Sequence, residues 1–162
     1  MRHDVAVFFD IGDTLASPVI ENGRLARLDV YPFVTQVLAR LREFGDDRGS
    51  VALGLISNTG NATAEMMDDL LETCGLRSLF DPPLCLYSSV EGLDKSQPAL
   101  FERARSRAGL RADSCVYVGE DAAERAVAAS VGFRVSPQPL HALHLVESEF
   151  APPTPLSTHR TS

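Results

Sequence analysis

Short uninterrupted apolar runs alternate along the chain with longer segments in which apolar residues recur every three to four positions. Three of these runs are strong, at 5–9, 51–56 and 115–118, and two weaker ones lie at 84–87 and 133–135. A short apolar run bounded by polar residues and glycine is typical of a strand that is buried on both faces of a sheet. We therefore predict three buried strands and two further candidates.

Helical periodicity fills the intervals between the runs. The predicted helices cover residues 31–45, 61–74, 97–108, 122–131 and 140–150. Gly45 and Gly75 are expected to end the first two of them. In the second helix, Met66, Leu70 and Leu71 are expected to face the core. Strands that alternate with helices predict an α/β fold, namely a doubly wound parallel sheet with helices on both faces and right-handed crossovers.

Length and composition indicate one globular domain. At 162 residues we expect a single domain over 1–150, followed by a flexible, proline-rich tail over 151–162. Three cysteines are too few for a disulfide framework, so Cys74, Cys85 and Cys115 are expected to be small core residues.

Charge and hydropathy exclude two classes of partner. A net charge of −7 without a basic cluster argues against nucleic acid, since binding to phosphates needs a clustered basic face. The chain has no apolar run near the ~20 residues that span a bilayer and no signal-peptide core, so we expect no membrane partner and a cytoplasmic location. Lys95 is the only lysine.

Polar residues gather after the three strong strands. They are Asp10, Gly12, Asp13 and Thr14, then Ser57 and Asn58, then Glu120, Asp121 and Glu124. The carboxyl ends of parallel strands meet at one edge of a sheet, where ligands bind, and Lys95 precedes a helix on the same side. Carboxylates brought together without basic neighbours favour a hard cation such as Mg²⁺. A carboxylate nucleophile, a cation, a hydroxyl or amide clamp and a lysine suit phosphoryl transfer.

Four segments resemble, in order, the motifs of the haloacid dehalogenase-like hydrolase superfamily. They are Phe8 to Leu15, then Ile56-Ser57-Asn58, then Lys95 with Pro98 and Phe101, then Val118 to Asp121 with Glu124. The resemblance spans about residues 5–136. It implies a three-layer, Rossmann-like sheet in which the first strand is central.

The resemblance also implies a role for each polar residue. Asp10 would be the nucleophile that becomes an aspartyl-phosphate, and Ser57 and Lys95 would bind the transferring group. The expected substrate-binding residues are Gly12, Asp13, Thr14 and Asn58. The expected Mg²⁺ ligands are Asp10, the carbonyl of Gly12, Glu120, Asp121 and Glu124.

The sequence departs from the family pattern at three positions. Gly12 stands where the family's phosphatases carry a general acid, which typically contributes 10²–10⁴-fold. We therefore expect a phosphatase that favours activated leaving groups. Glu120 and Glu124 stand where aspartate is more common, and each is longer by one methylene, which Mg²⁺ geometry tolerates poorly.

Other interpretations remain open for several of these residues. Ser57 suits a turn and helix cap, and the acids near 120–124 suit a helix N-terminus. The alternative function is a catalytically impaired domain that serves as a binding or regulatory module.

The resemblance points to the capless type. Residues 16–31 suffice for a flap and no more, and residues 58–95 leave no room for a cap domain. An open site needs water excluded by another component. We expect a phosphorylated substrate, either a small molecule or a macromolecule. A macromolecular substrate or a neighbouring subunit of a homo-oligomer would shield the open site.

Overall fold

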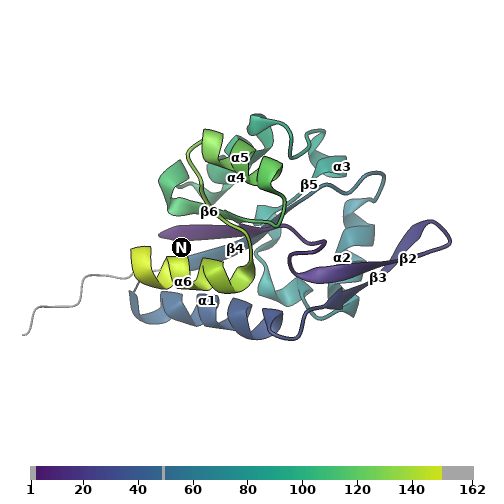
Figure 1. Cartoon of the computed structure of the whole chain (residues 1–162), viewed down its shortest axis with the longest axis horizontal. Helices are drawn as coiled ribbons and strands as arrows, with labels where there is room; N and C mark the ends of the chain where they lie inside the picture. The colour runs from purple at the N-terminus through teal and green to yellow at the C-terminus, as the bar shows by residue number, and fades with distance from the viewer. Residues whose placement is uncertain (1–2, 49, 151–162) are drawn as a thin grey trace, which may run out of the picture.

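The computed structural model describes residues 3–48 and 50–150, and within them it contains a five-stranded parallel sheet in the order β5-β4-β1-β6-β7. Its strands are β1 (Val5–Phe9), β4 (Val51–Ser57), β5 (Cys85–Tyr87), β6 (Cys115–Val118) and β7 (Arg134–Ser136). β1 lies at the centre, paired with β4 on one side and β6 on the other (Figure 1). The predicted parallel sheet and the central place of its first strand are confirmed.

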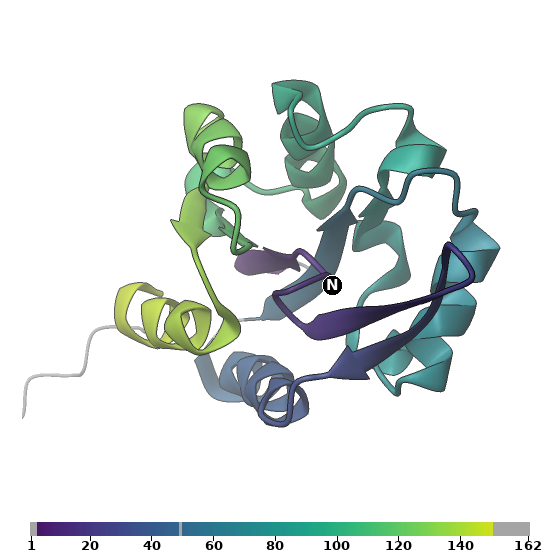
Figure 2. The same cartoon turned by 45° about the vertical axis from the view of Figure 1, so that its right-hand side comes forward.

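Helices cover both faces of the sheet, which gives three layers (Figures 1 and 2). They are α1 (Val34–Arg48), α2 (Ala64–Thr73), α3 (Ser88–Glu91), α4 (Pro98–Ala108), α5 (Ala122–Ser130) and α6 (Pro139–Glu149). Short 3₁₀ turns are η1 (Arg77–Leu79), η2 (Pro82–Leu84) and η3 (Ala112–Ser114). Helices α1, α2 and α6 pack on one face, and α4 and α5 pack on the other.

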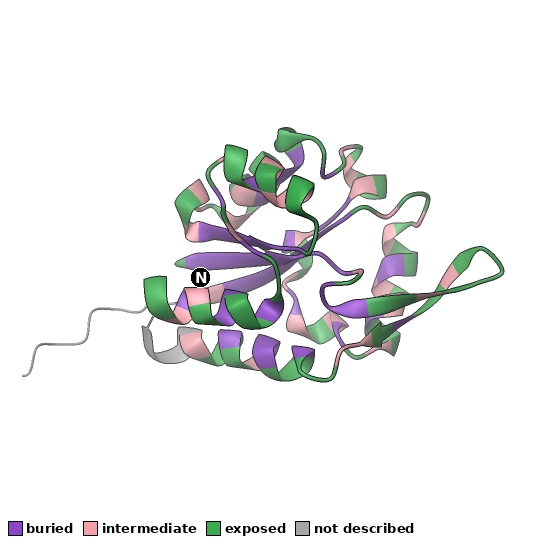
Figure 3. Ribbon diagram, viewed as in Figure 1, coloured by how far each residue is buried: buried purple, intermediate pink, exposed green. Residues whose placement is uncertain are grey.

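The two halves of the core meet at β1, whose side chains alternate between them. Phe9 and its neighbours at alternate positions face α1, α2 and α6, while Phe8 faces α4 and α5. Figure 3 shows the central strands buried and the outer helix surfaces exposed. In β4, a Cβ at Gly54 would lie 2.4 Å from the Leu84 carbonyl oxygen, so only glycine fits there. This rigid sheet fixes the strand ends at which the candidate residues lie.

A β-hairpin occupies the interval where we expected a flap. It pairs β2 (Ala16–Glu21) with β3 (Arg24–Val30) in antiparallel fashion, and it stands beside α2 (Figure 2). Its turn is Asn22-Gly23, and both residues have left-handed φ, +52° and +75°. Asn-Gly is the preferred pair for a two-residue hairpin turn of this kind. The hairpin covers one approach to the carboxyl end of β1.

Two predictions about the helices need correction. Gly45 does not end α1, which continues to Arg48; a helical glycine costs only about 1 kcal/mol and does not by itself stop a helix. In α2, Met67 and Leu71 are buried, whereas Met66 is 52% exposed, so the helix faces the core through Met67 rather than Met66.

The cysteine prediction holds for one residue of three. Cys115 is buried, but Cys74 and Cys85 are half-buried at the margin of the core. All three are free thiols.

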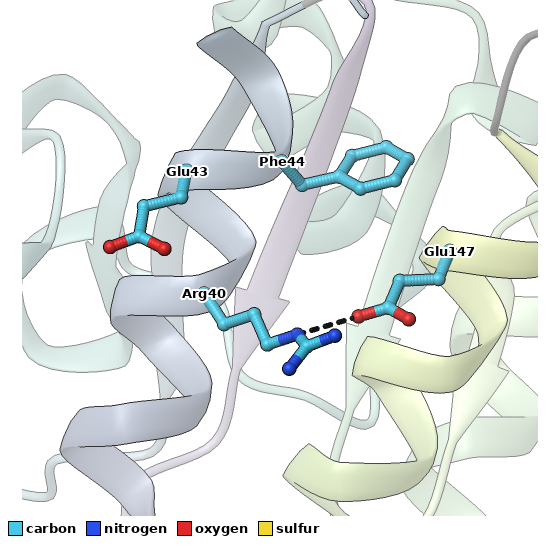
Figure 4. A pocket seen from close by; sticks show the side chains of 4 residues that line it. All are labelled: Arg40, Glu43, Phe44 and Glu147. Carbon is cyan, nitrogen blue, oxygen red and sulfur yellow. Dashed lines mark hydrogen bonds and ion pairs between the residues drawn. The ribbon is translucent and has the colours of Figure 1, made fainter. Parts of the chain in front are cut away.

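Helices α1 and α6 lie side by side, and a shallow pocket of about 400 Å³ opens between them. Figure 4 shows Arg40 of α1 reaching Glu147 of α6, with Nε 3.0 Å from Oε1. Both partners are exposed, so this pair contributes little stability. Among the described residues, no helix is long and apolar enough to cross a membrane. The predicted tail over 151–162 lies outside the described residues.

Candidate active site

The carboxylate of Asp10 forms a buried ion pair with the ammonium of Lys95. Asp10 is the first residue after β1, and its backbone N–H donates to the Val118 carbonyl of β6 at 2.8 Å. Lys95 lies in the loop between α3 and α4, and its Nζ is 2.7 Å from Asp10 Oδ1. Lys95 is 3% exposed and Asp10 is 9% exposed, so water screens the pair little.

Glu124, in the first turn of α5, holds the same ammonium from the other side. Its Oε2 lies 2.8 Å from Lys95 Nζ and also accepts a hydrogen bond of 3.1 Å from the Tyr117 hydroxyl. Burial raises the pKa of Tyr117, so the hydroxyl stays protonated and donates. A Cβ at Gly119 would lie 2.7 Å from that hydroxyl oxygen, so the glycine makes room for it. Hydrogen bonds and ion pairs thus connect the side chains of Tyr117, Glu124, Lys95 and Asp10 in that order.

Burial raises the pKa of the Asp10 carboxyl above its ordinary value of 3.8. The ammonium of Lys95 opposes this shift by its charge and its hydrogen bond, and the negative charge of Glu124 adds to it. Desolvation of the carboxylate therefore outweighs the partial compensation by Lys95. A carboxylate that is poorly solvated in this way is a stronger nucleophile than one in water.

The end of β4 supplies Ser57 and Asn58. Ser57 is 6% exposed, and no described residue hydrogen-bonds to its hydroxyl, which leaves the group available to a ligand. Asn58 Oδ1 accepts the backbone N–H of Lys95 at 3.0 Å, so it fixes the loop that carries the lysine. Next to it, the Thr59 backbone N–H donates to Ser88 Oγ at 2.8 Å and ties this loop to α3.

The loop after β1 contains Gly12, Asp13 and Thr14. Thr14 is buried, and its hydroxyl accepts the Glu120 backbone N–H at 3.3 Å, so it joins this loop to the start of α5. Asp13 is exposed, with a left-handed φ of +62°, and its N–H donates to the Ala16 carbonyl at 2.8 Å. A Cβ at Gly12 would meet only Pro18 Cγ, at 3.7 Å, an ordinary contact.

The expected metal ligands are only partly assembled. Asp121 caps α5 by accepting the Glu124 N–H at 3.0 Å, and both Asp121 and Glu120 are exposed. Over residues 3–48 and 50–150, no three or more His, Cys, Asp or Glu side chains form a group that could hold a metal. The donors that remain are the Asp10 carboxylate, the Gly12 carbonyl and these two acids. They are hard oxygen donors that suit Mg²⁺, which keeps several of its waters. Glu124 is instead engaged by Lys95.

A groove of about 830 Å³ runs from the strand ends along the hairpin. Gly12, Ser57 and Asn58 line its inner end. One wall comes from the hairpin and the other from the segment that leads into α2 and from α2 itself. Ile11 and Gly12, the two residues that follow the candidate nucleophile, also line this groove.

Sequence reasoning missed Tyr117 and the hairpin wall. A tyrosine inside an otherwise aliphatic buried strand was a usable signal, because a buried hydroxyl needs a hydrogen-bond partner. The Asn22-Gly23 pair between two segments of alternating pattern was the corresponding signal for the hairpin.

Solved structures resemble this fold over most of its length. A HAD-superfamily hydrolase from Ehrlichia chaffeensis matches with a TM-score of 0.66 at 12% identity, covering 90% of this chain and 97% of that one. A HAD-superfamily hydrolase of subfamily IA from Geobacter sulfurreducens matches at 0.61 and 15%, covering 81% and 87%. The 2-haloacid dehalogenase of Pseudomonas syringae pv. tomato matches at 0.61 and 19%, covering 81% and 84%. The fold is haloacid dehalogenase-like.

These similarities concern the fold. The sequence matches no protein-family model and no curated protein. The chain spans only 44% of another dehalogenase that it resembles with a TM-score of 0.57. In a haloacid dehalogenase-like fold, a cap would be inserted after β1 or after β4, and among the described residues those intervals contain the hairpin and the α2 to α3 segment instead. The described chain is therefore of the capless type.

The raised pKa of Asp10 predicts how the stability of the protein varies with pH. Below about pH 3.8 the carboxyl is protonated in both the folded and the unfolded state, so it contributes nothing. As pH rises through the higher folded pKa, the unfolded state loses its proton first, and the wild type becomes less stable relative to a neutral variant. We expect the melting temperature of Asp10→Asn, minus that of the wild type, to increase between about pH 4 and pH 7.

Asp94→Asn is the control with the opposite sign. Hydrogen bonds from Ser96 lower the pKa of the exposed Asp94 below 3.8, so that variant should lose stability relative to the wild type as pH rises to about 4, and the difference should then stay constant up to pH 7. A difference for Asp10→Asn that stays flat or falls would contradict net desolvation of Asp10.

Tyr117→Phe should weaken the support of Lys95. We expect a loss of about 1 kcal/mol in the free energy of unfolding, because one hydrogen bond to a buried carboxylate is removed. For the hydrolysis reaction proposed in the next subsection, we also expect a several-fold decrease in kcat with little change in KM, because Glu124 then holds the lysine less firmly.

Tyr87→Phe is the matched control, since its hydroxyl donates to Asp68 at 3.4 Å, away from the ion pair. It should lower stability and leave kcat unchanged. Equal kcat values for the two variants would assign Tyr117 a purely structural role.

Proposed function

We propose that the protein is a Mg²⁺-dependent phosphoryl-transfer hydrolase in which Asp10 is the nucleophile. The observation that carries the proposal is the Lys95 ammonium, buried between Asp10 Oδ1 at 2.7 Å and Glu124 Oε2 at 2.8 Å. Burying a lysine with two carboxylates costs desolvation free energy, so the arrangement is weak evidence for a role in stability. Here it orients the Asp10 carboxylate and offers positive charge where a phosphoryl oxygen would lie.

The reaction would use the second carboxylate oxygen of Asp10. That oxygen attacks phosphorus, the bond from phosphorus to the leaving-group oxygen breaks, and the leaving group departs with the electron pair. Water then attacks the phosphorus of the aspartyl-phosphate, which releases phosphate and restores the carboxylate. The Ser57 hydroxyl and the Asn58 amide at the end of β4 would bind the equatorial oxygens during both steps.

The Asp10 carboxylate and the Gly12 carbonyl would hold Mg²⁺ together with one of the exposed acids, Glu120 or Asp121. When bound, the ion would neutralise part of the phosphoryl charge. Since Glu124 is taken by Lys95, we expect most of the coordination sphere to be water and the binding to be weak. Binding of Mg²⁺ to the protein is measurable by calorimetry without any substrate.

Gly12 sets the class of leaving group. No side chain is available at that position to protonate a departing oxygen, so groups that leave readily as anions are favoured. Acyl phosphates and aryl phosphates have such leaving groups, whereas alkyl phosphates do not.

Dehalogenation is a second candidate function, and the glycine at position 12 is compatible with it. A carboxylate that attacks carbon and displaces halide needs no acid for the leaving group, and solved structures of similar fold include haloacid dehalogenases. We rank it second because Ser57, Asn58 and Lys95 together suit an oxyanion with several oxygens. Halide release from 2-chloropropionate distinguishes the two candidates.

The proposal predicts hydrolysis of activated phosphates. Purified protein with Mg²⁺ should hydrolyse acetyl phosphate and para-nitrophenyl phosphate, and Asp10→Asn should reduce the rate to that of the buffer alone. Asp113→Asn is the control and should retain activity, because Asp113 is exposed in η3, before the amino end of β6 and away from the strand ends that carry the site.

Two negative results together would contradict the enzyme and favour a binding or regulatory module. They are no turnover of any activated phosphate and no change in melting temperature with Mg²⁺ and beryllofluoride.

Gly12→Asp should raise turnover of alkyl phosphates by about 10-fold or more, because it supplies the missing acid. The position has room for a Cβ and does not have a left-handed φ, so the variant should fold. Rates with glycerol 3-phosphate measure the effect. Gly12→Asn is the isosteric control without a proton to donate, and an equal rise in that variant would rule out acid catalysis as the cause.

A further inference from the structure

The groove beside Asp10 continues directly from the proposed phosphoryl site. Its inner end is lined by Gly12, Ser57 and Asn58, the residues that would surround the phosphoryl group. From there it extends between the hairpin and α2, away from the strand ends. The volume of about 830 Å³ is enough for a ring-sized group.

The walls of this groove are mainly apolar. Pro18, Leu25 and Leu28 come from the hairpin, and Met66 and Met67 come from α2. Met66 is 52% exposed, and a ligand in the groove would cover it. Methionine side chains adapt to aromatic rings and make favourable sulfur contacts with them.

One charged side chain lines the groove, and it is basic. Arg24 begins β3 next to the hairpin turn, and it forms no ion pair with any described residue. Leu28 lies four residues further along the strand, nearer to Asp10, so the backbone of Arg24 is about 13 Å further out, at roughly 3.3 Å per residue. Among residues 3–48 and 50–150, no acidic side chain lines the groove. Its lining is therefore neutral near Asp10, apolar along its length and positive at its outer end.

We propose that the substrate is an aryl phosphate whose ring lies in this groove and carries an anionic group, such as a carboxylate, that faces Arg24. The proposal rests on the proposed function and specifies its substrate. It joins two independent observations: Gly12 requires a leaving group that departs as an anion, and the groove requires one that is apolar and ring-sized. An aryloxide satisfies both, whereas acetate satisfies only the first.

Binding tests the proposal without turnover. The chain has three methionines, and two of them line the groove, so ¹³C-methyl methionine signals in the Asp10→Asn variant report occupancy. Phenylphosphonate and 4-phosphonobenzoate should shift the Met66 and Met67 signals, which Met66→Leu and Met67→Leu assign. Methylphosphonate should leave both signals in place. Equal shifts with methylphosphonate, or none with the aryl compounds, would overturn the proposal.

The same titrations test the role of Arg24. In Asp10→Asn, 4-phosphonobenzoate should bind about two- to fivefold more tightly than phenylphosphonate, the range expected for one exposed charge pair. Addition of Arg24→Gln should abolish that difference. Addition of Arg27→Gln should retain it, because Arg27 lies on the same strand but pairs with Glu21 and Asp29. An unchanged ratio in the Arg24→Gln protein would remove Arg24 from the site.

Kinetics separate this proposal from the proposed function. Met66→Gln should lower kcat/KM for phenyl phosphate by about fivefold or more and leave acetyl phosphate unaffected. Leu140→Gln, an equally exposed apolar position on α6, should change neither rate. Hydrolysis of acetyl phosphate together with indifference to Met66→Gln would overturn the groove and spare the function. Aryl phosphonate binding without hydrolysis of any phosphate would overturn the function and spare the groove.

Discussion

The buried ammonium of Lys95 is the charge around which this end of the fold is arranged. This charge is almost inaccessible to water, and two carboxylates balance it. Asp10 directly follows β1, and Glu124 lies in the first turn of α5, which follows β6. Removing one partner of such a pair typically costs about 3–5 kcal/mol, because the other charge stays buried. Because β1 and β6 are neighbours in the sheet, the residues that follow these strands bring both carboxylates to one lysine.

Several contacts keep the lysine in that position. Asn58 binds the backbone of Lys95, Tyr117 supports Glu124, and Thr14 joins the loop after β1 to the start of α5. None of these contacts involves the predicted nucleophile directly. They make the site rigid on elements of the sheet, and such rigidity lets a nucleophile act without reorganisation. The hairpin beside it is largely exposed and forms one wall of the groove in which we propose that the leaving group lies.

Most of the fold could be predicted from the sequence, because buried strands and amphipathic helices follow simple periodicities. The apolar run before Asp10 and the glycines after α2 and α4 suffice to place those elements within a few residues. The buried face of α2 was harder to predict, because Met66 and Met67 are adjacent and equally apolar, and packing buries Met67 while Met66 lines the groove. The sharing of Lys95 between two acids was also beyond prediction, because it depends on which of three neighbouring carboxylates the α5 turn brings inward. Glu124 turns in, while Asp121 serves as the cap.

A phosphoryl group captured on Asp10 would test the proposed chemistry most directly. The protein is mixed with acetyl phosphate and Mg²⁺, quenched in acid during steady turnover, digested, and analysed by mass spectrometry. We expect one phosphoryl group on the peptide that contains Asp10 and none in the Asp10→Asn variant. Continued hydrolysis without a phosphorylated Asp10, or with the phosphoryl group on another residue, would contradict the assignment of Asp10 as the nucleophile.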